Sequence, residues 1–222
     1  MHKQRIVLLP GFSEDAYIFD KLKAYFNDYE LVFVDYREAL NKHSLSEIDV
    51  WKFNDSLIQQ YAIAKTDKLI GHSMGGYFSF LIREKLACEI CMIASFSDPN
   101  KVKRITKNQF ITKLTAQSGL LKTDLFQSFI KKPTKGKYFE KEYEKVMQNM
   151  KTFTSTQLAK MAKMSFGNKI ESKFENPLRI HATNDTIVRT PDEKYFEIKL
   201  GHFCLMLEPQ EVIKPIQKWL QD

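Results

Sequence analysis

The chain contains few cysteines and no long apolar run. Its 222 residues include three cysteines, Cys88, Cys91 and Cys204, and no second Cys-x-x-Cys pair that could complete a zinc site. We therefore expect free, buried thiols in a reducing cytoplasm, with no metal and no cofactor. No apolar stretch approaches the roughly 18 residues of a transmembrane segment, so none is expected. The apolar run at residues 6–9 ends at Pro10 and is too short for the core of a signal peptide.

Internal repeats and low-complexity tracts are also absent, and the composition, 43% hydrophobic and 27% charged, is that of a globular protein. Residues 97–170 hold 16 Lys and Arg against 5 Asp and Glu, whereas the rest of the chain holds 18 against 22. A solvated helical surface accounts for this excess, and two alternatives stay open: attraction of an anionic substrate, such as a phosphate- or CoA-bearing ester, and contact with an acidic membrane surface. Nucleic-acid binding is not expected, because no compact basic and aromatic element is present.

Short strand-like runs alternate with helical patterns over the first 96 residues. The four runs lie at residues 6–9, 31–36, 68–71 and 89–95. Their nearly continuous apolar character is typical of strands buried on both faces, and the alternation predicts βαβ units in a parallel sheet. Residues 44–64 are long enough for a crossover helix between the second and third strands.

The pattern changes after Asp98-Pro99, because the next strand-like run begins only at Pro177. Apolar residues recur at helical spacing in between: Leu125, Phe126, Phe129 and Ile130 form one face, and Leu158, Met161, Ala162 and Phe166 another. We therefore expect a core of residues 1–96 and 171–222, with a helical cap inserted at residues 97–170. Some of its Met and Phe side chains could line an acyl pocket, although packing against the sheet is the expected role for most.

Residues 71–76 read Gly-His-Ser-Met-Gly-Gly and follow the end of a strand-like run. A mixed apolar stretch without proline continues to Cys88 and is long enough for a helix, so the serine lies where a strand gives way to a helix. On such a sharp turn the positions two before and two after the serine must lack bulk, and Gly71 and Gly75 meet that need. The motif predicts that Ser73 is a nucleophile.

A serine nucleophile needs an imidazole as general base. His202 is the best candidate, because it follows Gly201 and the strand-like run at residues 195–200, and open α/β sheets bind ligands at the carboxyl ends of their strands. The other histidines are less well placed: His2 lies at the terminus, His43 in a polar loop, His72 beside the serine but pointing away, and His181 inside a strand.

The base in turn needs a carboxylate to orient it. Asp185 is preferred, because it lies just past the strand-like run at residues 177–181. Asp98 is the alternative, although its Asp-Pro context equally marks a turn that opens the cap.

Two backbone N–H groups could stabilise the negative charge that develops on a substrate carbonyl oxygen. The N–H of Met74 begins the helix after the nucleophile, and that of Phe12 lies in the turn after the first strand, where Gly11 permits close approach. For the neighbouring Ser13 we expect a different role, as the cap of a following helix.

Ser73, Asp185 and His202 in this order, with Pro10-Gly11-Phe12 upstream, resemble the α/β-hydrolase superfamily over nearly the whole chain apart from the cap. Residues 201–212 are similar to its histidine loop and last helix. The resemblance implies a mainly parallel six-stranded sheet in the order 2-1-3-4-5-6, flanked by helices, with the cap between strands four and five. Two departures are the Pro-Gly in place of the common His-Gly, and the 16 residues between Asp185 and His202. These are too few for a full crossover, which leaves the direction of the last strand open.

The expected function is a serine hydrolase of class EC 3.1 that cleaves a carboxylic ester or thioester of a small-molecule acyl substrate through an acyl-serine intermediate. An anionic substrate is one of the alternatives that the basic segment leaves open. Carbon–carbon bond hydrolysis or a lyase step on the same scaffold remains an alternative, since the fold does not decide between them. A second alternative is a non-catalytic protein that binds a ligand.

Overall fold

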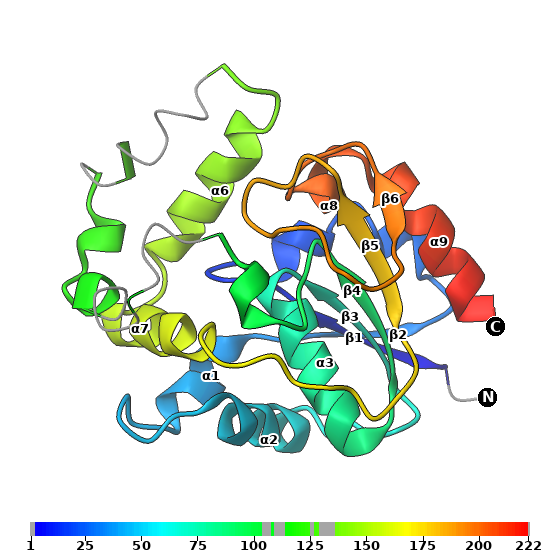
Figure 1. Ribbon diagram of the computed structural model, residues 1–222, viewed down its shortest axis with the longest axis horizontal. Helices are drawn as coiled ribbons and strands as arrows, with labels where there is room; N and C mark the ends of the chain where they lie inside the picture. Colours follow the sequence, from blue (N-terminus) through cyan, green and yellow to red (C-terminus); the bar gives the residue numbers. More distant parts are fainter. Residues whose placement is uncertain (1–2, 104–107, 109–113, 125–126, 129–135, 222) are drawn as a thin grey trace.

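The computed structural model describes residues 3–103, 108, 114–124, 127–128 and 136–221. At its centre is a six-stranded sheet in the order β2-β1-β3-β4-β5-β6, in which all neighbouring strands are parallel (Figure 1). The strands are β1 (Arg5–Leu9), β2 (Glu30–Phe33), β3 (Lys68–His72), β4 (Glu89–Ile93), β5 (Leu178–Ala182) and β6 (Phe196–Ile198). The predicted strand order is confirmed, and the last strand is parallel to its neighbour.

Helices cover the sheet and bury its apolar side chains. On one face α3 (Met74–Leu86) packs against β1, β3 and β4, α2 (Val50–Gln60) packs against α3, and α1 (Tyr36–Asn41) against α2. Elsewhere α9 (Pro209–Gln221) packs against β5 and β6, and α8 (Cys204–Leu207) contacts the short helix η1 (Ala16–Phe19), which is followed by η2 (Lys23–Tyr25). The central strands β1, β3 and β4 each bury their last four residues, as expected for strands covered on both faces.

Capping residues set several boundaries that the apolar pattern does not show. The predicted second strand reaches residue 36, but β2 ends at Phe33 because Asp35 caps α1 by accepting a hydrogen bond from Arg37 N at 2.9 Å. Likewise α2 begins at Val50, after the N-cap residue Asp49. The connection from β5 to β6, residues 183–195, contains no helix.

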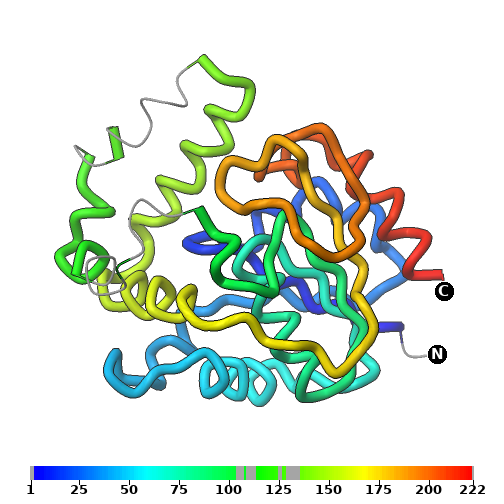
Figure 2. The backbone as a smooth tube through the Cα atoms, viewed as in Figure 1, coloured from blue at the N-terminus to red at the C-terminus, as the bar shows by residue number. Residues whose placement is uncertain are grey.

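The described part of the 97–170 segment is helical. It contains η3 (Pro99–Lys101), η4 (Leu120–Lys122), α6 (Glu140–Met150) and α7 (Ser155–Met164). Figures 1 and 2 show α6 and α7 on one side of the sheet and both chain ends on the opposite side. Of the two predicted apolar faces, residues 158, 161 and 162 are buried on α7 and Phe166 lies beyond its end, whereas residues 125, 126, 129 and 130 lie outside the described residues.

Three side chains of α7 donate hydrogen bonds to backbone carbonyls in and after α1. These are Gln157 Nε2 to Arg37 O at 3.4 Å, Lys160 Nζ to Leu40 O at 2.7 Å, and Lys163 Nζ to Ser46 O at 2.9 Å. The carbonyls at the end of a helix lack intrahelical partners and carry partial negative charge, so lysine is a suitable donor to them. This contact places α7 against the core of the molecule.

All three cysteines are buried free thiols, as predicted. None of the helices in the described residues combines the length and the apolarity that crossing a bilayer requires.

Candidate active site

Ser73 lies at the turn between β3 and α3 in an unusual backbone conformation, with φ 52° and ψ −121°. Positive φ is rare for residues other than glycine, and surrounding contacts must hold it. Here the N–H of Ser73 donates to Ile93 O at 2.9 Å, and its carbonyl accepts from Ser95 Oγ at 2.6 Å. The turn is therefore held by the neighbouring strand β4 and the residues after it.

The glycines around Ser73 are required by close backbone packing. A Cβ on Gly75 would lie 2.0 Å from Leu9 O, and a Cβ on Gly71 would lie 2.4 Å from Gly75 O. Both distances are far inside van der Waals contact, and the atoms met are backbone. Only glycine fits at either position.

The structure brings Ser73, His202 and Asp185 together, although they are widely separated in sequence. Ser73 Oγ lies 3.0 Å from His202 Nε2, and His202 Nδ1 lies 2.8 Å from Asp185 Oδ2. Because a carboxylate only accepts hydrogen bonds, Nδ1 carries the hydrogen and Nε2 offers its lone pair to the serine hydroxyl. All three side chains are buried, with exposed fractions of 7%, 5% and 4% for Ser73, His202 and Asp185.

Asp185 is held in place through its second oxygen as well. Asp185 Oδ1 accepts from the backbone N–H groups of Ile187 at 2.7 Å and Val188 at 2.8 Å. Burial alone would raise the pKa of this carboxyl, but His202 and the two N–H donors favour the ionised form, and the net result is a lowered pKa. The carboxylate is thus charged and fixed in orientation at neutral pH.

The other candidates from the sequence lie elsewhere. Asp98 caps η3, accepting from Asn100 N at 2.9 Å. His43 contacts Ser56 Oγ at 2.7 Å. His181 is buried in β5, where neither ring nitrogen has a hydrogen-bond partner in the described residues. His2 lies outside the described residues.

The backbone N–H groups of Phe12 and Met74 have no acceptor in the part of the chain that the structure describes. Both residues line the same cavity as Ser73 and His202. At Gly11 a Cβ would lie 3.0 Å from Ser73 Cβ, so the turn after β1 approaches the serine closely. Two residues with unpaired N–H donors therefore line the cavity next to the serine.

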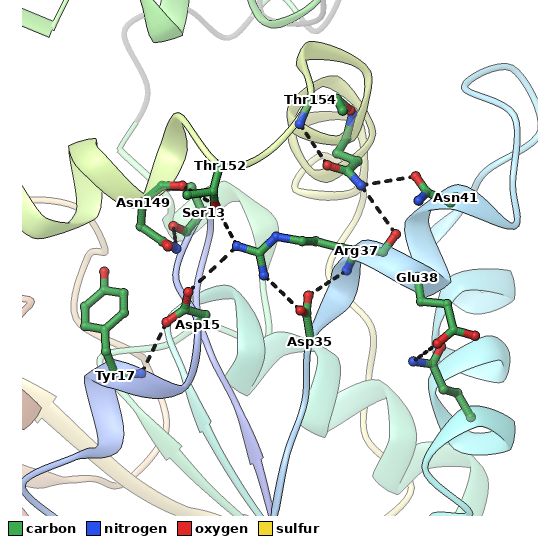
Figure 3. A network of polar contacts seen from close by, with 12 residues as sticks. Ser13, Asp15, Tyr17, Asp35, Arg37, Glu38, Asn41, Asn149, Thr152 and Thr154 are labelled. Atoms are coloured by element: carbon green, nitrogen blue, oxygen red, sulfur yellow. Dashed lines mark hydrogen bonds and ion pairs between the residues drawn. The ribbon is translucent and has the colours of Figure 1, made fainter.

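The expected capping role of Ser13 is wrong, because Asp15 caps η1 instead by accepting from Tyr17 N at 3.3 Å. Ser13 is fully buried with φ 54°, and its Oγ has no partner among the described residues. Its carbonyl accepts from Asn149 Nδ2 of α6 at 2.7 Å (Figure 3). The serine is therefore a strained link in the turn, held by the 97–170 segment.

Arg37 of α1 joins this turn to the end of α6 (Figure 3). Its guanidinium donates to Thr152 Oγ1 at 2.6 Å and Asp35 Oδ2 at 2.9 Å, and lies 3.7 Å from Asp15 Oδ2. It also stacks on the ring of Phe153, 4.2 Å from its centroid. The network ties three elements around one side of the site.

Sequence reasoning missed Glu14, and it considered His72 only as a base for Ser73 and not as the partner of Glu14. Both are buried, with Glu14 Oε2 lying 2.8 Å from His72 Nδ1 and accepting from Gly11 N at 2.6 Å. His72 Nε2 donates to the backbone carbonyl of His202 at 2.9 Å. His72 contacts the backbone of His202 instead of Ser73. A carboxylate two residues after Phe12 and a histidine directly before Ser73 were the available signals.

The cavity at this site has a volume of about 220 Å³. Apart from the residues already described, its wall is mainly apolar, and α6 contributes Tyr143, Val146, Met147 and Met150. The 97–170 segment and the sheet therefore enclose the space next to Ser73 together. Within the described ranges, no group of three or more His, Cys, Asp or Glu side chains is arranged to hold a metal ion.

No protein-family model matches the sequence, and no curated protein sequence matches it either. The structure, in contrast, is similar to solved structures over its whole length. A hydrolase from Oleispira antarctica has a TM-score of 0.73 at 10% identity, covering 100% of this chain and 92% of that chain. An esterase from Exiguobacterium antarcticum has a TM-score of 0.73 at 14% identity, and an enol-lactonase from Burkholderia xenovorans LB400 has 0.72 at 12%, each covering 100% of this chain and 93% of its own.

Proposed function

We propose that this chain, which has the α/β-hydrolase fold, is a serine hydrolase that cleaves a carboxylic ester or thioester. The observation that carries the proposal is the hydrogen-bonded line from Ser73 Oγ through the His202 ring to Asp185, at the wall of a cavity. Solved structures of the same fold include esterases and an enol-lactonase, which supports the proposal at the level of the scaffold.

In the proposed reaction, Ser73 Oγ attacks the carbonyl carbon while His202 Nε2 takes the hydroxyl proton. The electron pair of the carbonyl bond moves onto its oxygen. When this intermediate collapses, the bond to the leaving oxygen or sulfur breaks, and that atom takes the proton from Nε2. A water molecule then attacks the acyl-serine in the same manner and releases the acid. Asp185 holds the ring and stabilises the imidazolium in both steps.

The N–H groups of Phe12 and Met74 are the proposed oxyanion donors. Each fixed donor of this kind is worth a factor of about 10² to 10³ in rate. Their freedom from other acceptors supports the assignment, because a donor already engaged would have to break a bond first.

The size of the cavity favours a small acyl group. Its volume of about 220 Å³ is below the roughly 300–1,000 Å³ of sites for drug-sized ligands. We further propose that the 97–170 segment acts as a cap, since Tyr143, Met147 and Met150 would contact the acyl chain. Aryl esters of short acids should then be cleaved at least about tenfold more efficiently than esters of ten-carbon acids, because apolar fit discriminates by about 1–3 kcal/mol.

A fluorophosphonate probe tests the nucleophile directly. The purified protein should be labelled stoichiometrically, the label should map to Ser73, and Ser73→Ala should not be labelled. Ser118→Ala is the matched control, because Ser118 is exposed on the 97–170 segment and should be labelled at the wild-type rate.

Two outcomes would contradict the proposal in different ways. If folded wild-type protein takes up no label and a panel of short aryl esters shows no turnover, the chain is a non-catalytic ligand-binding protein. If Ser73 is labelled but no ester or thioester is cleaved, the alternative of carbon–carbon bond hydrolysis or a lyase step is favoured instead.

A further inference from the structure

Glu14 and His72 form a buried pair beside the proposed catalytic residues, without belonging to them. Glu14 is 4% and His72 is 1% exposed, and their Oε2 and Nδ1 atoms lie 2.8 Å apart. The His72 and His202 rings are 4.9 Å apart between centroids. Burying ionisable groups is costly, so a pair that persists in such a place needs an explanation.

The partners of His72 indicate which protons it carries. The carbonyl of His202 can only accept a hydrogen bond, so His72 Nε2 must hold a hydrogen. Glu14 Oε2 faces two nitrogen atoms, Gly11 N and His72 Nδ1, and as a carboxylate it accepts from both. Both ring nitrogens then carry hydrogens, and His72 is an imidazolium paired with Glu14.

The charges around His72 agree with this assignment. Burial alone would lower the pKa of His72, but Glu14, the His202 carbonyl and the more distant Asp185 outweigh burial and raise it. The titratable groups that face the ring are thus Glu14, Asp185 and the His202 side chain.

The pair contacts both halves of the proposed machinery. Glu14 holds Gly11 N, directly before the proposed oxyanion donor Phe12 N. His72 holds the carbonyl of His202, whose side chain is the proposed base. The contact to Gly11 also explains how the turn after β1 is held with Pro10-Gly11 where the family commonly has His-Gly.

We propose that the Glu14–His72 ion pair positions the oxyanion turn and the general base relative to each other. This proposal rests on the proposed hydrolase function. Glu14 and His72 are positioning residues, since they act through Phe12 N–H and His202 and not on the substrate.

Three variants test the two contacts, and a fourth is the control. Glu14→Gln removes the charge, and a neutral His72 ring can then donate from only one of its two nitrogens, so it loses either the contact to residue 14 or the contact to the His202 carbonyl. In His72→Asn the amide stands near the Nδ1 position, so the contact to Glu14 is kept and the contact to the His202 carbonyl is lost. In His72→Gln the amide stands near the Nε2 position, so the contact to the His202 carbonyl is kept and the contact to Glu14 is lost. His43→Gln is the matched control, because His43 lies in the loop between α1 and α2, with Ser56 as its partner.

The readout is the kinetics of fluorophosphonate labelling at Ser73, with each variant checked for folding by its urea midpoint. We expect the limiting rate to fall about tenfold to a hundredfold in Glu14→Gln and in both His72 variants, because misplacement by about 1 Å can cost a factor of 10². The half-saturating probe concentration should stay within about twofold of wild type, since binding of the probe is not altered. The double variant Glu14→Gln/His72→Gln should be no more than about threefold slower than the slower single variant, because the two residues act as one unit.

Nitrogen-15 NMR of histidine-labelled wild-type protein at pH 7 measures the protonation state of the His72 ring, and it does not depend on enzymatic activity. The His72 ring should show two protonated nitrogens, and its signals are assigned because they disappear in His72→Gln. In Glu14→Gln the His72 ring should be neutral. A neutral His72 ring in wild type overturns the proposal even if every variant unfolds. Folded Glu14 and His72 variants that label at the wild-type limiting rate also overturn it. Absence of labelling in wild type would instead refute the hydrolase function, and the NMR result would still report on the pair.

Discussion

Ser73 and the glycines next to it show how closely single residues are specified at this site. The serine is held at φ 52° by hydrogen bonds to Ile93 and Ser95. Gly75 lies against the backbone at the end of β1, with no room for a methyl group. The turn can therefore form only if the start of α3 packs directly against the backbone at the end of β1.

Replacing Gly75 with alanine tests this close approach. Its Cβ would meet Leu9 O at 2.0 Å and Pro10 O at 2.4 Å. Because backbone on both sides must move, we expect a loss of at least about 2 kcal/mol in the free energy of unfolding and loss of fluorophosphonate labelling. Urea denaturation measures the first effect.

Gly136→Ala is the control, since Gly136 also lacks a Cβ but has nothing within 4 Å of the position where one would be. Its φ of +74° alone should cost about 1 kcal/mol. Gly75 lies in α3 and is not one of the described glycines with positive φ, so its own loss must come from the contact with β1. A loss in Gly75→Ala no larger than that in Gly136→Ala would contradict this close contact.

At the scale of elements, the placement of α7 depends on side chains that bind backbone carbonyls in and after α1. Lys160 is buried, with 5% of its surface exposed, and its ammonium group donates to Leu40 O at 2.7 Å. The contact joins the 97–170 segment to the core 120 residues earlier in the chain. Together with the Arg37 network, it sets the position of α6 and thus of one cavity wall.

Lys160→Met keeps most of the apolar stem of this side chain and removes its donor. The carbonyl of Leu40 is then left buried without a partner, which costs about 1–3 kcal/mol in the free energy of unfolding. The urea midpoint should fall accordingly. Lys145→Met removes the same charge from an exposed position of α6 and should change stability by less than about 0.5 kcal/mol. If the free energy of unfolding falls equally in both variants, the change in net charge and not the lost contact to α1 explains the loss.

At the scale of the whole molecule, stability should depend on pH through two buried histidines, His72 and His181. Their contributions change in opposite directions as the pH rises. The pKa of His72 is raised above its ordinary 6.5, so its contribution to stability is complete below that pH and is lost as the pH rises through the raised pKa. The pKa of His181 is lowered by burial, so its neutral form is favoured in the folded state and stability is lost as the pH falls below 6.5.

The difference in the free energy of unfolding between a variant and wild type, measured at several pH values, gives the contribution of each histidine. His72→Gln should lose more stability at about pH 5.5 than at about pH 8.5. His181→Gln should be more stable relative to wild type at the lower pH than at the higher one. Urea midpoints at several pH values measure both slopes. Slopes of the same sign in the two variants would contradict the assignment of charge to His72.

The elements that could be predicted from sequence are those with a local signal. The strands at residues 6–9, 68–71 and 89–95 were recognisable because each is a short apolar run, and their order followed from the family resemblance. Boundaries were less accurate where a polar residue decides them, as Asp35 does at the end of β2. The connection between β5 and β6 was expected to be short, and it contains no helix.

By itself, the sequence indicated the individual strands, the glycine-flanked turn at Ser73 and the choice of His202 and Asp185 as candidates, since each of these depends on neighbours within a few positions. Only the tertiary structure decided that Glu14 meets His72, 58 residues away, that His72 meets the carbonyl of His202, 130 residues away, and that Ser13 is held by Asn149. Periodicity records which side of an element faces the core, but it carries no information on which buried polar groups become partners when distant segments pack together.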